Sequence, residues 1–447
     1  MRFRTGLATG FVMLAALAVC TPAQISLSSA VDMALRNDPR VSMAKADVAK
    51  AQATLAGTHD VYVPSITADG GYGQGFGVPT GLPVVFSMSS QSLVYNFSQR
   101  DNVRAASAAL EAGRLALRET NDQVAEDVVV TYLNLDTAQR RQAAMTQEYG
   151  IASRLVTIVQ QRLDAGQDTR IELLRAQRSA TQIQLEQLQT DDEATTLSEH
   201  LARLIGLPGN HLDVISDSIP ALPTIHPLAG NEPDSFGVKS AFASARGKQE
   251  YAFGIGRYRL RPQISLSLNY SRIDTKQNGY TRYYPNFAGQ SENAESVFLQ
   301  IQIPLFDRKH EDDVRAAAAD AAHARFEARN QQNQFLDNRF RLQHSTAELS
   351  AQSELAQIDL DIAEEQMNAV LAQLSTSTAN DNRPQLTPKD EQNARLLVSA
   401  RTIDLLNAHF QLNQAAVNLL RQTGQLDDWL KTGAVMPASL VASPVTH

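Results

Sequence analysis

The sequence is poor in cysteine and in aromatic residues. Its 447 residues contain one cysteine and one tryptophan, and aromatic residues make up only 6%. A single cysteine excludes an intramolecular disulfide, and so few aromatic residues argue against a large aromatic core. The formal net charge is −8. This mild acidity argues against a general nucleic-acid binder, which needs a basic face.

Long apolar runs are missing downstream of the N-terminus. No stretch of 18 apolar residues occurs there, so the sequence predicts no transmembrane helix in the mature chain. At the N-terminus, two arginines precede an apolar run over residues 7–19. This pattern is typical of a secretory signal peptide. We assign residues 1–23 to the signal peptide, with cleavage after Ala18 or Ala23.

The single cysteine, Cys20, lies beside these cleavage sites. One interpretation is lipidation of Cys20 as the first residue of the mature chain, because residues 17–20 are close to a lipoprotein cleavage box. Val19 fits this box poorly. The alternative is a cysteine that is removed with the signal peptide. In either case no cysteine after Cys20 is left for disulfide or thiolate chemistry in the exported chain.

Proline is absent from residues 84–207, and this absence permits very long helices. Helix-forming residues fill the stretch 102–203, which predicts one long helix, a turn at residues 163–166 and a second long helix that returns. A first helix of about 60 residues would be roughly 90 Å long. Ser98 and Asp101 predict a capping box at its start, and Gly166 suits the turn.

Two pairs of segments change from a helical period to a period of two, within residues 62–97 and 261–305. Between the first two strands, residues 73–83 are rich in glycine. We interpret them as a surface loop, because a phosphate-binding loop would precede a helix. In the second pair, apolar residues alternate with polar ones. The apolar face collects Ile264, Leu266, Leu268, Tyr270, Val297, Leu299, Ile301 and Ile303.

The same order of elements occurs twice, which predicts an internal duplication. Each half has a helix, a strand pair and a long helical hairpin. Between the halves lies a linker, in which five prolines exclude a regular helix. We expect a first repeat at 24–206 (strands in 62–97, hairpin 99–206), a linker at 207–236, a second repeat at 237–424 (strands in 261–305, hairpin 307–424) and a disordered C-terminal tail at 425–447.

The sequence predicts no helix that would cover the faces of the predicted strands. Four strands cannot close a barrel, since the smallest closed barrels need about eight. Open strand edges are costly in lipid, and exposed apolar rows promote aggregation in water. Several chains that share one barrel resolve both problems, with apolar faces toward lipid and polar faces toward an aqueous lumen. The sequence therefore predicts a mainly α protein with β-strands, built as an outer-membrane barrel and a periplasmic helical rod.

The ordered set of segments resembles the TolC-type outer-membrane efflux proteins, over nearly the whole mature chain. No single motif carries this resemblance. The segments that carry it are residues 27–39, Pro64, residues 161–166 with Thr169 and Glu172, residues 201–207 and residues 303–307. The resemblance implies a homotrimer that shares one outer-membrane β-barrel, with four strands per chain. It also implies a long periplasmic α-helical coiled-coil barrel and an equatorial belt formed by the linker and the tail.

The resemblance implies a passive exit duct of a tripartite efflux or type I secretion system. The cargo would be small molecules, metals or polypeptide. The partners would be outer-membrane lipid, a periplasmic adaptor (membrane fusion) protein and an inner-membrane pump. The adaptor would contact the first helical tip, at Arg162, Leu163, Asp164, Ala165, Gly166 and Gln167.

The second half departs from the family pattern at its tip. No Arg-Leu-x-x-Gly turn occurs there, and residues 375–386 are polar and irregular. Thr387 and Pro388 then start the last helix. Family members carry acidic residues that narrow the tunnel mouth at positions that align near Lys389 and Gln392. The tunnel-mouth candidates are Lys389, Asp390, Glu391 and Gln392.

Signals for enzyme chemistry are absent. No nucleophile–base pair and no HExxH-type motif stands out, so we expect no catalytic, cofactor or metal residues. The acidic run at 311–313 could bind a cation, but acids in a first helical turn more often complement the helix dipole. His310, His323 and His344 lack a common metal spacing. The alternative function is a periplasmic coiled-coil scaffold or adaptor without a channel, which would be soluble.

Overall fold

The computed structural model describes residues 23–71, 84–209, 212–222, 235–258, 261–273, 285–287, 292–376 and 387–434. The chain forms two compact units. The tip unit comprises residues up to Ala30, Thr131–Pro220 and Asp359–Asn407. The sheet unit comprises Val31–Val130, Ala221–Ile358 and the residues from Ala408 onward.

Long helices dominate the described residues. The first half has β1 (Ala23–Ile25), α1 (Leu27–Asn37), α2 (Pro39–Asp60), β2 (Ser65–Gly70), β3 (Val84–Asn96), α3 (Gln99–Asp164) and α4 (Arg170–Leu204). A connection follows with β4 (Leu212–Val214) and the 3-10 turn η1 (Ser216–Ser218). The second half has α5 (Phe236–Tyr258), β5 (Gln263–Ile273), the turn η2 (Pro285–Phe287), β6 (Asn293–Gln302), α7 (Arg308–Thr376), α8 (Pro388–Thr423) and α9 (Leu426–Ala434). The two halves share an order of elements, and the internal duplication stays a prediction.

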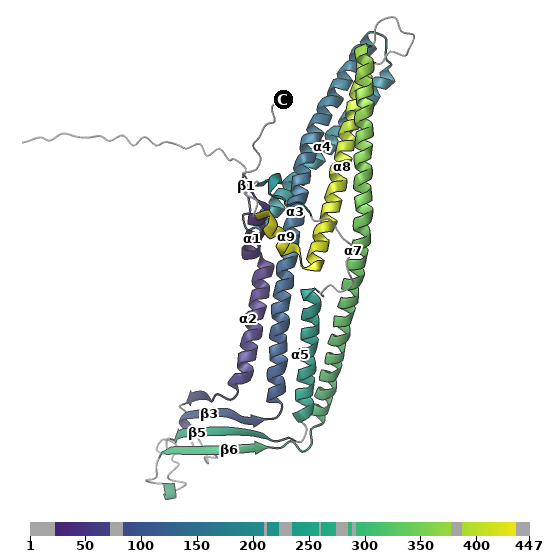
Figure 1. Cartoon of the computed structure of the whole chain (residues 1–447). Helices are drawn as coiled ribbons and strands as arrows, with labels where there is room; N and C mark the ends of the chain where they lie inside the picture. Colours follow the sequence, from purple (N-terminus) through teal and green to yellow (C-terminus); the bar gives the residue numbers. More distant parts are fainter. Residues whose placement is uncertain are drawn as a thin grey trace, which may run out of the picture. The chain divides into compact units, whose positions relative to one another are not determined.

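The sheet unit contains one antiparallel four-stranded sheet. Its strand order is β2-β3-β5-β6, so β2 and β6 are the two edge strands. Figure 1 shows β3, β5 and β6 as neighbours. Strand β3 has register irregularities between Val84 and Phe86 and between Leu93 and Tyr95. Such irregularities bend a strand and increase its twist. The predicted pairs of strands are therefore confirmed, and the middle strands β3 and β5 join the two halves of the chain.

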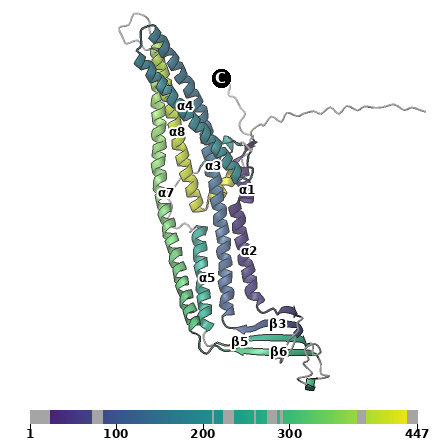
Figure 2. The same ribbon diagram turned by 180° about the vertical axis from the view of Figure 1, so that it is seen from behind.

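Helices α2, α3, α5 and α7 lie side by side in the sheet unit in both views (Figures 1 and 2). Small residues allow close approach. A Cβ atom added to Gly247 of α5 would lie 3.1 Å from the carbonyl oxygen of Ala105 in α3. The hydroxyl of Ser240 donates to the Ala112 carbonyl across the same pair of helices, at 2.8 Å. Helix α5 is therefore held against α3 by backbone-to-backbone proximity rather than by large side chains.

In the tip unit, β1 pairs with β4 in a short parallel ladder. The buried hydroxyl of Tyr132 in α3 connects this ladder to the helix. Its oxygen lies 2.7 Å from the Ile25 carbonyl oxygen and 2.9 Å from the Ser218 hydroxyl, and it accepts a hydrogen bond from the Ile215 amide at 2.8 Å. Tyr132 thus satisfies backbone groups from both strands' ends.

Replacing Tyr132 by phenylalanine is expected to destabilise the protein by about 1–3 kcal/mol, because buried hydrogen-bonding groups lose their partner while the ring still fills its site. Thermal unfolding of the purified protein in detergent would show a lower midpoint. The matched control is Tyr251→Phe, since Tyr251 is 51% exposed. Equal midpoints for both variants would contradict a structural role for the Tyr132 hydroxyl.

Several helix starts follow the sequence signals. The Asp38 carboxylate caps α2 by accepting from the Arg40 amide at 2.7 Å, with Pro39 in the first turn. The Asp307 carboxylate accepts from the His310 amide at 3.0 Å at the start of α7. Helix α1 ends at Asn37 and α2 begins at Pro39, because proline disfavours a helical conformation at the residue before it.

Three expectations need correction. The predicted capping box at Ser98 is wrong: among the described residues, the buried Ser98 hydroxyl has no hydrogen-bond partner, and Asp101 instead accepts from Arg257 at 3.1 Å. Helix α7 continues to Thr376, so the predicted irregular segment is wrong at residues 375 and 376. The disordered tail is wrong over Leu426–Ala434, which form α9 and bury Trp429.

Candidate functional site

The first tip is a tight helix–turn–helix connection. Helix α3 ends at Asp164, and Gly166 adopts a φ of 74°. The Gly166 amide donates to the Leu163 carbonyl at 2.9 Å and the Gln167 amide donates to the Arg162 carbonyl at 2.8 Å. These two bonds form a Schellman cap, which favours glycine at the left-handed position. The sequence signal at Gly166 is thus confirmed in its geometry.

Side chains fix the ends of this turn and leave its centre exposed. The Arg162 guanidinium contacts the Asp168 carboxylate at 2.9 Å, and Gln160 donates to Asp164 at 2.8 Å. Thr169 caps α4. Of the six predicted contact residues, Arg162 and Leu163 are half-buried, while Asp164, Ala165, Gly166 and Gln167 are exposed. The turn therefore presents a rigid, accessible backbone, as a docking point needs.

The start of α8 is capped by the sequence signal that predicted it. The Asp390 carboxylate accepts from the Thr387 amide at 2.7 Å and from the Thr387 hydroxyl at 2.8 Å. Residues 377–386, which contain most of the unusual second tip, lie outside the described residues. Asp390 is therefore occupied in the cap of its own helix.

The structure joins this helix start to the first hairpin. The Lys389 ammonium lies 2.8 Å from a carboxylate oxygen of Glu172, in the first turn of α4. The hydrogen bond from Lys389 lowers the pKa of the Glu172 carboxyl. Glu172 also contacts Arg175 at 2.8 Å. Sequence reasoning named Glu172 only for its resemblance and missed its pairing with Lys389.

The other two mouth candidates have local environments. Glu391 contacts Arg395, one turn further along α8, at 2.8 Å. Gln392 is buried, and within the described residues its side-chain oxygen has no hydrogen-bond partner. A small apolar cluster lies at this end of the tip unit. Its members are Leu155, Val159 and Ala176, with Val156, Leu173 and Leu396 packed against them. Of the four candidates, Lys389 is the one that links α8 to α4.

The sheet separates apolar and polar side chains onto two faces. In the β5–β6 register, Ile264 pairs with Ile301, Leu266 with Leu299 and Leu268 with Val297. Directly paired residues in a ladder lie on the same face, so these six predicted residues form one apolar surface. Tyr270 pairs with Glu295 at the end of this surface. Ile303 lies beyond the end of β6 and is 52% exposed.

The opposite face of the sheet carries a row of small polar side chains, with Phe298 of β6 beside this row, paired with Ser267. Thr67, Ser89, Asn269 and Ser296 form one continuous row across the four strands. The Thr67 and Ser89 hydroxyls are 2.7 Å apart within this row. On the apolar side, Val297, Leu299 and Ile301 are between 59% and 70% exposed. A sheet with one mainly polar face and one exposed apolar face fits a boundary between water and lipid.

Three further expectations concern lipidation, membrane-spanning helices and metal binding. Cys20 lies outside the described residues. Within the described ranges, every helix is either too short or too polar to span a bilayer. The same ranges contain no group of three or more His, Cys, Asp or Glu side chains able to hold a metal ion.

Both the sequence and the fold of this chain match known proteins. The sequence profile described as "Outer membrane efflux protein" matches residues 30–207. The match lies in the first half of the chain. It agrees with the one-sided sheet and the long helical hairpins of the protein. The resemblance to TolC-type outer-membrane efflux proteins is therefore confirmed.

Two relatives share low sequence identity with this chain. The nickel-cobalt-cadmium resistance protein NccC of Alcaligenes xylosoxydans xylosoxydans is 24% identical over 250 residues, which are 56% of this chain and only about half (51%) of NccC. The outer membrane efflux protein BepC of Brucella suis is 24% identical over 425 residues, covering 90% of this chain and 86% of BepC.

The solved structure of the Campylobacter jejuni CmeC outer membrane channel has the same fold. It superposes with a TM-score of 0.70 over 97% of each chain, at 15% sequence identity. The predicted fold class is confirmed by this likeness: strands of an outer-membrane barrel and long α-helices of a helical barrel.

Proposed function

We propose that the protein is the outer-membrane exit duct of a tripartite efflux or type I secretion system and works as a homotrimer. The observation that carries the proposal is the four-stranded sheet with one exposed apolar face and two edge strands, β2 and β6. In lipid, each open edge would leave backbone groups without partners. Three copies that pair β6 of one chain with β2 of the next would close a barrel without edges.

Exposed apolar stripes on the helices support the same assembly. On α4, Ile171, Leu174, Leu185 and Leu188 are each more than half exposed, and their spacings fit a heptad repeat. On α7, within the sheet unit, Phe326, Leu336 and Phe340 are exposed at positions that also follow a heptad. Stripes of this kind suit helix packing against neighbouring copies of the chain. Packing within one copy leaves these apolar side chains exposed to water.

The tip residues would serve two steps of transport, contact with the adaptor and opening of the tunnel mouth. The exposed turn at residues 164–167 is suited to contact a periplasmic adaptor, since its backbone is held by the cap and by the Arg162–Asp168 pair. The pairing of Lys389 with Glu172 ties α8 to α4. Movement of α8 away from α4 would have to break this pair, so the pair is a candidate latch of the tunnel mouth.

The cargo is a separate proposal. The name of NccC concerns nickel, cobalt and cadmium, and the name of BepC concerns efflux. By analogy, small molecules or metal cations are the first cargo to test, and secreted polypeptide is the second. Deletion of the gene, followed by growth on graded nickel, cobalt, cadmium and drugs, would identify the sensitivity that the wild-type gene restores.

The assembly is tested by membrane fractionation and by mass determination in detergent. A species in the outer membrane with three times the mass of the mature chain supports the shared barrel. A soluble periplasmic monomer would reject it and favour the alternative, a coiled-coil scaffold or adaptor without a channel.

A further inference from the structure

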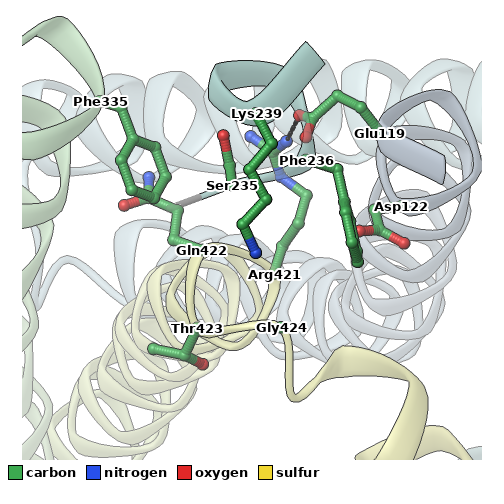
Figure 3. A pocket seen from close by; sticks show the side chains of 10 residues that line it. All are labelled: Glu119, Asp122, Ser235, Phe236, Lys239, Phe335, Arg421, Gln422, Thr423 and Gly424. Atoms are coloured by element: carbon green, nitrogen blue, oxygen red, sulfur yellow. Dashed lines mark hydrogen bonds and ion pairs between the residues drawn. The ribbon is translucent and has the colours of Figure 1, made fainter. Parts of the chain in front are cut away.

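A small cavity in the sheet unit is lined by side chains from four helices. Its volume is about 110 Å³. Figure 3 shows Glu119 and Asp122 of α3, Lys239 of α5, Phe335 of α7 and Arg421 of α8 around it. The cavity lies at the end of α8. Gly424 adopts a φ of 72° and closes the last turn of this helix. None of the proposed duct functions uses these residues.

Glu119 and Arg421 together connect three helices. One carboxylate oxygen of Glu119 accepts from the Gly237 amide in the first turn of α5 at 2.8 Å, and the other contacts the Arg421 guanidinium at 3.0 Å. The Arg421 guanidinium also contacts the carboxyl group of Glu126, two turns further along the same face of α3. The end of α8 is therefore held on α3 by one guanidinium shared between two carboxyl groups.

The charges around Arg421 do not balance when every acid is ionised. Asp122 lies beside Glu119 and Glu126 on the same face of α3. The charged groups that face this cluster are Arg40 of α2, Arg118, Glu119, Asp122, Glu126 and Asp127 of α3, Lys239 of α5, Arg421 of α8 and Asp427 of α9. Two of the cations lie over the Phe236 ring, at 5.5 Å for Arg118 and 5.4 Å for Lys239. Arg40 is paired with Asp127.

Burial makes two of these acids hold their protons near neutral pH. Burial, with repulsion from Asp427 and Glu119, raises the pKa of Asp122 to about 6. Burial outweighs the attraction of Arg421 and, with repulsion from Asp127 and Glu119, raises the pKa of Glu126 to about 7. Among the described residues no group of three or more His, Cys, Asp or Glu side chains could hold a metal ion.

The direction of the pH effect follows from these shifts. A raised pKa means that the packed arrangement binds protons more tightly than an opened, hydrated one. The packed arrangement is therefore favoured most at pH values below the ordinary carboxyl range. This advantage is lost as the pH rises through about 6 and then 7, where Asp122 and Glu126 ionise in the packed state.

We propose that the Arg421 cluster is a proton-sensitive clamp on the end of α8, closed while Asp122 and Glu126 carry protons and loosened when both are ionised. With both acids neutral, Arg421 and Glu119 form one balanced pair that also caps α5. With both ionised, three neighbouring carboxylates on α3 compete for one guanidinium in a partly dry site. Repulsion then favours hydration of the cluster and opening of the contact between α8, α3 and α5.

Hydrogen exchange of the full-length protein in detergent tests the clamp. Protection factors, corrected for the intrinsic pH dependence of exchange, are compared at pH 5.5 and pH 8 in the last turns of α8 and the first turn of α5. We expect protection to fall by on the order of ten- to a hundredfold at pH 8 in the wild type, because each pKa unit corresponds to a tenfold change. In the double variant Asp122→Asn with Glu126→Gln we expect little pH dependence.

Controls separate the clamp from general effects. Asp320→Asn removes an exposed acid of α7 in the same unit and should keep the wild-type pH response. If the double variant does not fold, Glu126→Gln alone should shift the remaining response toward the lower pKa of Asp122. Equal wild-type protection at the two pH values would overturn the proposal, as would an unchanged response in Glu126→Gln.

Discussion

Leu299→Arg is expected to prevent the protein from accumulating as a trimer in the outer membrane. Leu299 lies in β6, is 63% exposed and pairs with Leu266 on the apolar face. If this face meets lipid, an arginine near the bilayer midplane costs about 2–4 kcal/mol per site. A trimer carries three such sites, and the total is comparable with the whole stability of many domains.

The matched control is Gln300→Arg. It introduces the same side chain one residue further along the same strand, on the opposite face, where Gln300 pairs with Ser265. An arginine in an aqueous lumen should be tolerated. Density-gradient fractionation and the trimer band on unheated gels would separate the two variants. Tolerance of Leu299→Arg together with loss of Gln300→Arg would reverse the assignment of the two faces.

Periodicity predicted the sheet because each strand carries its own signal. In β5 the alternation of Ile264, Leu266 and Leu268 with serine and asparagine needs no knowledge of the rest of the chain. The same holds for the long helices, because the absence of proline and the glycine at the turn are both visible within the segment itself.

Long-range contacts were beyond sequence reasoning. The β1–β4 ladder has three residue pairs, too few for a periodic signal. The predicted cap at Ser98 failed because Asp101 is paired with Arg257, which lies 156 residues away. The pairing of Lys389 with Glu172 spans 217 residues. A single sequence holds no information on which of its many charged residues become neighbours. Helix α9 was missed because its short segment follows Gly424 and relies on burial of Trp429 for stability.

Lys389→Glu is expected to open the tunnel mouth. The substitution replaces an attraction at 2.8 Å by repulsion between two carboxylates. Both side chains are partly exposed, 24% for Lys389 and 31% for Glu172. The pair is therefore weak in each copy, because water and salt screen exposed charges. Loss of the pair and gain of repulsion in three copies would add to a severalfold shift toward an open mouth.

Single-channel conductance in planar bilayers measures this effect, with larger or longer openings expected for Lys389→Glu. The charge swap, Lys389→Glu with Glu172→Lys, should restore the wild-type conductance because it recreates the pair with opposite polarity. Arg395→Glu is the matched control. It makes the same change of charge on α8 but breaks only the contact with Glu391 within that helix. If Arg395→Glu opens the channel as much as Lys389→Glu does, the charge of the mouth and not the α4–α8 pair controls conductance.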